Sequence, residues 1–118
     1  MNINDDNGDC AARSAAVRKL NDEFRRTLIG GTVLMTTGVV ALGADAQAEA
    51  LAKVQAFDAF NADNDPWAEH DFGEIEVEGE RLFWKLDYFD MTRAHHSPEP
   101  ADPAVTERVL TIMLASEY

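Results

Sequence analysis

The spacing of hydrophobic residues changes along the chain, and in three segments it predicts a helix. Over about residues 12–28, apolar residues recur at three- and four-residue steps, as on one face of a helix. The apolar stripe consists of Val17, Leu20, Phe24 and Leu28, and the opposite face of Arg13, Arg18, Arg25 and Arg26. A second helix is expected over residues 45–59. A third is expected over residues 103–115, because Asp102 directly precedes Pro103, as an N-cap precedes a first helical proline.

Alternation with period two predicts a hairpin in the second half of the chain. One strand is expected over residues 73–78, where apolar residues alternate with glutamates. After a turn at residues 78–80, a strand over residues 81–90 carries apolar side chains on both faces and is therefore expected at the centre of the sheet. Its Trp84 should be buried, and so should Leu86. The β-rich residues 32–37 predict one further strand.

These elements predict one α+β domain. The expected fold is a three-stranded antiparallel sheet packed with three helices, in the order α-β-α-β-β-α. The chain has 118 residues, 46% of them hydrophobic, which suffices for a single core. We expect this domain over residues 11–118, behind a flexible acidic tail of residues 1–10.

The sequence also predicts the cellular compartment of the protein. No apolar run approaches the roughly 20 residues that span a bilayer, so no membrane association is expected. The N-terminus lacks the basic start and apolar stretch of an export signal. Cys10 is the only cysteine and cannot form an internal disulfide, which is consistent with a reducing cytoplasm. A cytoplasmic protein is therefore expected.

Negative charge is concentrated in the second part of the chain. The formal net charge is −12, yet residues 1–44 hold five acids and five bases. Residues 45–118 hold seventeen acids and five bases, and residues 58–80 hold nine acids without a lysine or arginine. Such a surface repels phosphate backbones and attracts basic partners, so direct binding to nucleic acid is not expected. The alternative is that the charge serves solubility alone.

The row Glu74, Glu76 and Glu78 is the most specific charged feature. On one face of a strand these side chains are about 6.8 Å apart, from a rise of ~3.4 Å per residue. Phosphates along a DNA strand are spaced on a similar scale. We interpret the row as a partner-binding surface that imitates a nucleic-acid backbone. The alternative is the solvated face of an amphipathic strand.

Residues 63–71 (DNDPWAEHD) form the segment richest in functional groups. Its expected partner-binding residues are Asp63, Asp65, Trp67, Glu69 and Asp71. These carboxylates and His70 could ligate a divalent cation, but Ala68 stands where a calcium loop requires glycine, and no bound metal is expected. Alternatively, the aspartates close Asx-turns ahead of Pro66. Trp67 either covers the edge of the core or is exposed as a contact for a partner.

Further candidate residues predict no catalytic centre. His95 and His96 adjoin in a loop, and with His70 they could form a zinc site only if two loops meet. Cys10 has no base near it in sequence, so it is a poor nucleophile candidate. The chain contains no nucleophile elbow, P-loop or dinucleotide-binding glycine motif. We therefore expect a protein without catalytic residues, metal or cofactor.

Five segments carry a family resemblance: residues 20–25 (LNDEFR), 57–73 (FDAFNADNDPWAEHDFG), 83–90 (FWKLDYFD), 98–104 (PEPADPA) and 108–115 (RVLTIMLA). They resemble DUF3768, a family of small proteobacterial proteins of unknown function, over about residues 13–118. The resemblance implies no activity. It does imply a genomic setting, since such proteins are common on plasmids and other mobile elements.

Charge and resemblance together indicate a non-enzymatic acidic binding protein. The expected target is the basic surface of a nucleic-acid-binding host defence complex, inhibited in the anti-restriction or anti-CRISPR manner by a DNA-like face. One alternative is a small regulatory or structural interaction protein without DNA mimicry, for instance a homodimer. A third is a metal-dependent hydrolase built on residues 63–71.

Overall fold

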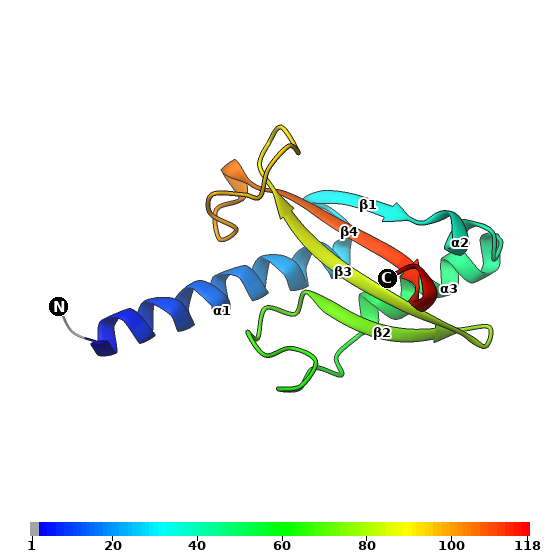
Figure 1. Cartoon of the computed structure of the whole chain (residues 1–118), viewed down its shortest axis with the longest axis horizontal. Helices are drawn as coiled ribbons and strands as arrows, with labels where there is room; N and C mark the ends of the chain where they lie inside the picture. The colour runs from blue at the N-terminus through cyan, green and yellow to red at the C-terminus, as the bar shows by residue number, and fades with distance from the viewer. Residues whose placement is uncertain (1–2) are drawn as a thin grey trace.

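The computed structural model describes residues 3–118, with side chains from residue 10 onward. It shows an α+β fold in which three helices accompany a four-stranded mixed sheet (Figure 1). In chain order the elements are α1 (Ile3–Thr27), β1 (Gly31–Met35), α2 (Thr37–Val40), α3 (Ala44–Ala56), β2 (Phe72–Val77), β3 (Glu80–Phe89), the 3₁₀ helix η1 (Pro103–Val105), β4 (Glu107–Leu114) and the 3₁₀ helix η2 (Ala115–Glu117).

The strand order is β1-β4-β3-β2. β2 and β3 form the expected hairpin, in which Val77 lies opposite Glu80 across a two-residue turn. The expectation that β3 is an inner strand with Trp84 and Leu86 buried is confirmed. The expectation of three strands, all antiparallel, is wrong in detail. β4 lies between β1 and β3, and it pairs with β1 in parallel.

The helix expected over residues 103–115 is wrong, because most of this segment is β4. Asp102 does act as an N-cap, since its carboxylate accepts a hydrogen bond from the backbone N–H of Ala104 at 2.9 Å, but the capped element is the three-residue η1. β4 is an inner strand, and Val109 and Ile112 are buried on opposite faces of it. Burial on both faces hides the period of two, so a short apolar run matches a helix as well as a strand.

Helix α1 starts earlier than the sequence pattern indicates. It includes residues 3–10 of the expected tail, whereas residues 1 and 2 lie outside the described residues, and the flexibility of the tail stays a prediction. The inward position of Val17 and Phe24 is confirmed. The solvent-facing position expected for Arg25 is wrong, because this side chain is 1% exposed. It is buried because α3 packs beside α1 and supplies acceptors for it.

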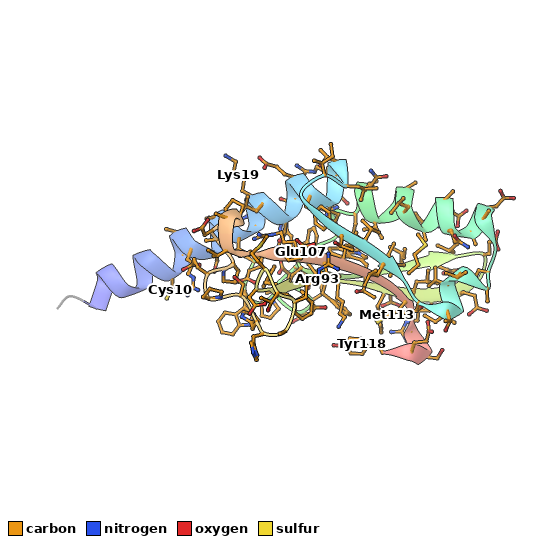
Figure 2. All side chains as sticks on the ribbon, turned by 90° about the horizontal axis from the view of Figure 1, so that it is seen from above. Cys10, Lys19, Arg93, Glu107, Met113 and Tyr118 are labelled. Atoms are coloured by element: carbon orange, nitrogen blue, oxygen red, sulfur yellow. The ribbon has the colours of Figure 1, made fainter. Side chains whose placement is uncertain are left out.

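The molecule has two layers. Figure 2 shows α1 and α3 on one face of the sheet, and the opposite face carrying Met113 and Tyr118. The core between the layers includes Val17, Phe24, Ala50, Val54, Leu82, Trp84, Leu110 and Ile112. No α-helix of the described chain covers the opposite face of the sheet, which we call the open face; only the short η2 lies against it. Within residues 3–118 no helix has both the length and the apolar character needed to cross a membrane.

Candidate functional site

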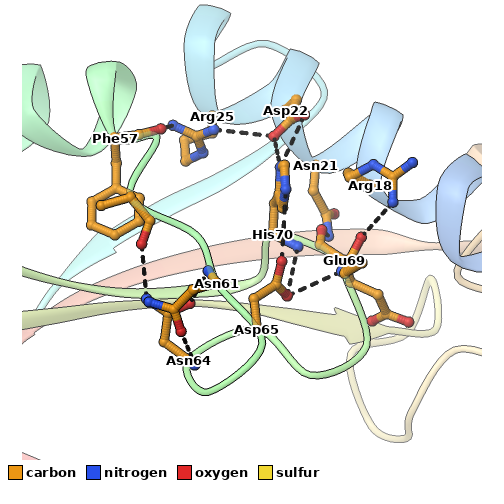
Figure 3. A network of polar contacts seen from close by, with 12 residues as sticks. Arg18, Asn21, Asp22, Arg25, Phe57, Asn61, Asn64, Asp65, Glu69 and His70 are labelled. Atoms are coloured by element: carbon orange, nitrogen blue, oxygen red, sulfur yellow. Dashed lines mark hydrogen bonds and ion pairs between the residues drawn. The ribbon is translucent and has the colours of Figure 1, made fainter.

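Polar side chains determine the shape of the loop between α3 and β2. Asp65 is 7% exposed, and its carboxylate accepts hydrogen bonds from the backbone N–H groups of Glu69 (3.1 Å) and His70 (3.2 Å). Two asparagines close the turn before it. The Asn64 side-chain oxygen accepts a hydrogen bond from the Asn61 N–H at 2.9 Å, and the Asn61 side-chain oxygen accepts one from the Asn64 N–H at 3.0 Å (Figure 3). The loop is therefore built by its own side chains.

His70 lies between two carboxylates from different segments. Its Nδ1 is 2.9 Å from Asp22 Oδ1 on α1, and its Nε2 is 3.6 Å from Asp65 Oδ2 (Figure 3). Its ring stacks on Phe60 with 3.8 Å between the ring centroids. Asp22 Oδ1 also accepts a hydrogen bond from Arg25 Nη2 at 3.0 Å. Nδ1 is within hydrogen-bond distance of the Asp22 carboxylate, and this contact fastens the loop to α1.

Arg25 binds the C-terminal end of α3. Its Nη1 donates to the backbone oxygens of Val54 and Phe57, both at 2.8 Å. The last carbonyl groups of a helix lack intrahelical partners and carry partial negative charge, so a buried cation is favourable there. The guanidinium also lies 5.4 Å from the ring centroids of Phe60 and Trp84. Arg25 thereby joins α1, α3 and the sheet.

Asn21 is the centre of a second buried network. Its Nδ2 donates to Tyr88 Oη at 2.8 Å and to the backbone oxygen of Glu69 at 2.9 Å, and its Oδ1 accepts from Arg108 Nε at 2.9 Å. The Tyr88 hydroxyl donates to Glu69 Oε1 at 3.1 Å, and Arg108 donates to the backbone oxygen of Pro100. Burial raises the pKa of the Tyr88 hydroxyl and lowers the pKa of Arg108. The network connects α1 to β3, to β4 and to both long loops.

A cleft of about 530 Å³ opens beside this network. Among the residues that line it are Cys10, Arg13, Trp67, Glu69, Tyr88 and His96. Trp67 is 75% exposed and therefore does not cover the edge of the core, whereas its contact with a partner stays a prediction. The neighbouring Ala68 has φ 54°, a left-handed conformation that is uncommon outside glycine. The loop therefore turns sharply beside the indole and presents it to solvent.

The expected glutamate row lies on the outer strand of the sheet. Glu74, Glu76 and Glu78 are exposed, so their register relative to the core is confirmed. β2 ends one residue before Glu78, which lies in the turn with φ 52°. Glu74 is paired with Arg81, and this hydrogen bond lowers the pKa of Glu74. We call Glu74, Glu76, Glu78 and the exposed Glu80 the acidic edge.

The other expected partner-binding residues differ in accessibility. Asp63 is exposed, and the Asx-turns expected at Asp63 and Asp65 are made by the asparagines instead. Asp65 is engaged inside the loop. Glu69 is half-buried against Tyr88. Asp71 is half-buried too, and burial, followed by the charge of Glu69, raises its pKa. Of these five expected partner-binding residues of the loop, Asp63 and Trp67 are the exposed ones.

The candidate metal ligands are not gathered into one group. Among the described side chains, no three histidine, cysteine or acidic residues are placed to hold a metal ion. His70 is held by Asp22 and Asp65, whereas His96 lines the cleft and its Nδ1 lies 2.9 Å from the backbone oxygen of Ser97. Asp65 Oδ1 already accepts hydrogen bonds from two backbone N–H groups of its own loop.

Sequence reasoning missed the residues that hold the loops in place. They are Asn21, Asp22, Arg25, Tyr88 and Arg108. A signal for two of them was present. Asn21 follows Val17 by four residues, so it occupies a core position of the helix, and Arg25 follows Asn21 by four more. Polar residues at such positions indicate a buried network, but their partners come from distant segments.

Comparison with known proteins identifies a family. The sequence model of DUF3768, described as a protein of unknown function, matches residues 35–117. No curated protein matches the chain. No solved structure matches it either.

Proposed function

We propose that this chain, a member of the DUF3768 family of proteins of unknown function, is a non-enzymatic acidic binding protein. Its partner is the basic surface of a protein or complex that binds nucleic acid, and its contact surface is the acidic edge. Such a partner attracts the acidic edge through the same lysines and arginines that hold phosphates.

Exposed, unpaired carboxylates at the β2–β3 turn carry this proposal. No ion pair joins Glu76, Glu78 or Glu80 to a lysine or arginine of the described chain. On the adjacent side of α3, Lys53 pairs with Glu49 and donates to the backbone oxygen of Glu76, so its charge is compensated and the helix is held beside β2. The tip of the hairpin therefore offers several carboxylates to a cation from outside.

The charges on the open face limit the proposed contact surface to one part of the sheet. Its basic residues are already paired, since Lys85 Nζ is 3.1 Å from Asp87 and Arg93 Nη2 is 2.8 Å from Glu107. Arg81 likewise binds Glu74. The centre of the face is thus close to neutral, and the uncompensated charge lies toward the hairpin tip.

The genomic setting that the resemblance implies favours one class of target. A mobile element gains from encoding a protein that blocks restriction or CRISPR complexes. The grooves in which these complexes bind nucleic acid are basic. The carboxylates of Glu76, Glu78 and Glu80 at the hairpin tip can occupy such a groove as phosphates do. We therefore propose an anti-restriction or anti-CRISPR inhibitor that acts as a DNA mimic.

Displacement of labelled DNA from purified restriction and CRISPR effector complexes tests this function. The wild type should compete with the DNA at low salt and lose this ability as salt rises. Changing Glu76, Glu78 and Glu80 together to lysine should abolish competition. Changing Asp5, Asp6 and Asp9 to lysine is the matched control, because it alters net charge equally at the other end of the chain, and competition should persist. Equal competition by both variants would refute the proposal.

A second candidate is an interaction protein without DNA mimicry, such as a homodimer. The open face favours it, because Leu34 is 50% exposed there and Tyr118 packs on Phe72 and Phe83 at the surface. Light scattering of the wild type and of Leu34→Glu distinguishes this candidate. A dimer that Leu34→Glu dissociates would support the homodimer, and a monomeric wild type would exclude it.

A further inference from the structure

The cleft beside Trp67 is remote from the acidic edge. Tyr88 in its wall and Glu80 at the hairpin lie eight residues apart on β3, which corresponds to roughly 26 Å at ~3.3 Å per residue. Figure 2 shows Cys10, another lining residue, near the far end of α1. The cleft is therefore a separate surface, and the proposed function does not use it.

Hydrogen-bond acceptors and aromatic rings dominate the chemistry of this cleft. Glu69 Oε1 accepts the Tyr88 hydroxyl, and Glu69 Oε2 has no hydrogen-bond partner among the described residues. His96 Nδ1 lies 2.9 Å from the Ser97 carbonyl oxygen and must donate to it, so the other nitrogen of the neutral ring is an acceptor. Trp67 adds an exposed indole. A ligand rich in donors and able to stack on an indole matches these groups.

Three arginines lie around the cleft, and none of them forms an ion pair with Glu69. Arg13 lines the cleft, but its Nε donates to Glu99 Oε1 at 2.9 Å, so its charge is compensated. Arg18 donates to the backbone oxygen of Ala68. Behind the wall, Arg108 is buried and donates to Asn21 and Pro100. Glu69 Oε2 therefore has no hydrogen-bond or ion-pair partner among the described residues, although the buried Arg108 is close enough to interact with the charge of Glu69.

We propose that this cleft binds the guanidinium group of an arginine side chain from a partner protein. The planar cation stacks on Trp67, and its N–H groups donate to the Glu69 carboxylate. Guanidinium has five donors and no acceptor, binds carboxylates in pairs of hydrogen bonds and stacks on aromatic faces. An ammonium group lacks the flat surface for stacking, so lysine binds more weakly.

Tryptophan fluorescence can measure this binding without knowledge of the partner. The chain has two tryptophans, and Trp84 is fully buried, so the solvent-sensitive emission comes from Trp67. The probe is N-acetyl-arginine amide, compared with N-acetyl-citrulline amide, which has nearly the same shape but no charge. We expect saturable binding of the arginine probe with a Kd of about 1 mM, typical for a ligand of this size. The citrulline probe should bind at least about tenfold more weakly.

Two variants separate charge from shape. Glu69→Gln keeps an acceptor for the Tyr88 hydroxyl and removes the charge, so the arginine probe should bind about tenfold more weakly. Asp63→Asn is the matched control, because it removes one charge from the same loop outside the cleft, and binding should not change. Trp67→Phe gives the background emission of Trp84. Cys10 supplies a second readout, since the arginine probe should slow its reaction with a thiol reagent.

The outcomes are distinct. Equal binding of citrulline and arginine, or unchanged affinity in Glu69→Gln, would overturn the proposal. Thermal melts show whether Glu69→Gln is folded. If it is not, the comparison of the two probes on the wild type still decides the question. Because no residue of the acidic edge takes part, failure here leaves the proposed function standing, and failure of DNA displacement leaves this site standing.

Discussion

Replacing Asn21 by alanine should destabilise the protein more than any surface change on α1. Asn21 is fully buried and makes three hydrogen bonds, two as donor and one as acceptor. The substitution removes all three and leaves Arg108 Nε without this partner. It therefore removes the buried link between the helix and both long loops, whereas Asp22–His70 and Arg13–Glu99 remain.

The expected loss follows from these bonds. Each of the two bonds to neutral groups contributes about 1 kcal/mol, and the bond from the charged Arg108 contributes about 1.5–3 kcal/mol. The sum is a loss of about 3–5 kcal/mol in the free energy of unfolding. A domain of this size has a total of about 5–15 kcal/mol, so Asn21→Ala should fold but be marginally stable.

Urea unfolding followed by circular dichroism measures this loss. With a slope of about 2 kcal/mol per molar urea, the midpoint should fall by roughly 2 M. Lys19→Ala is the matched control, because Lys19 is exposed on the same helix (Figure 2) and its change should stay within about 0.5 kcal/mol. A loss below about 1 kcal/mol for Asn21→Ala would refute the idea that this network holds the loops.

Three further substitutions test local features. Burial raises the pKa of Asp71 above its reference value of 3.8, so ionisation of this carboxyl group destabilises the folded protein as pH rises through the folded pKa. Asp71→Asn should therefore have a higher melting temperature than the wild type at pH 7. The difference should be absent below about pH 3.8. The hydrogen bonds from Thr36 and the backbone lower the pKa of Glu117, so its ionised form stabilises the fold. Glu117→Gln should therefore have a lower melting temperature than the wild type at pH 7, and the two should have the same melting temperature in acid. Gly73→Ala would place a methyl group against the buried Trp84 indole and should cost about 1–3 kcal/mol in urea unfolding; an unchanged midpoint would show that the indole can move.

The acidic edge could be predicted from the sequence because a strand has a strict period of two. Once Ile75 and Val77 face the core, Glu74 and Glu76 must face away from it. The turn residues that follow restrict the position of the hairpin as well. The cleft was not predictable in this way. Its walls come from α1, from the loop around Trp67 and from residues 96–100, and nothing in the local spacing indicates that these segments meet.

The sequence by itself determined the amphipathic elements: α1 and α3, the β2–β3 hairpin, the burial of Trp84 and the side of the sheet that carries the glutamates. In each of them one face is apolar and the other polar, so the spacing of apolar residues shows which face packs against the core. Only the tertiary structure decided that residues 107–114 form a strand and that Arg25 lies inside. A strand buried on both faces has no alternating pattern, and a buried arginine is stable only because α3, a distant segment, places its terminal carbonyl groups around it.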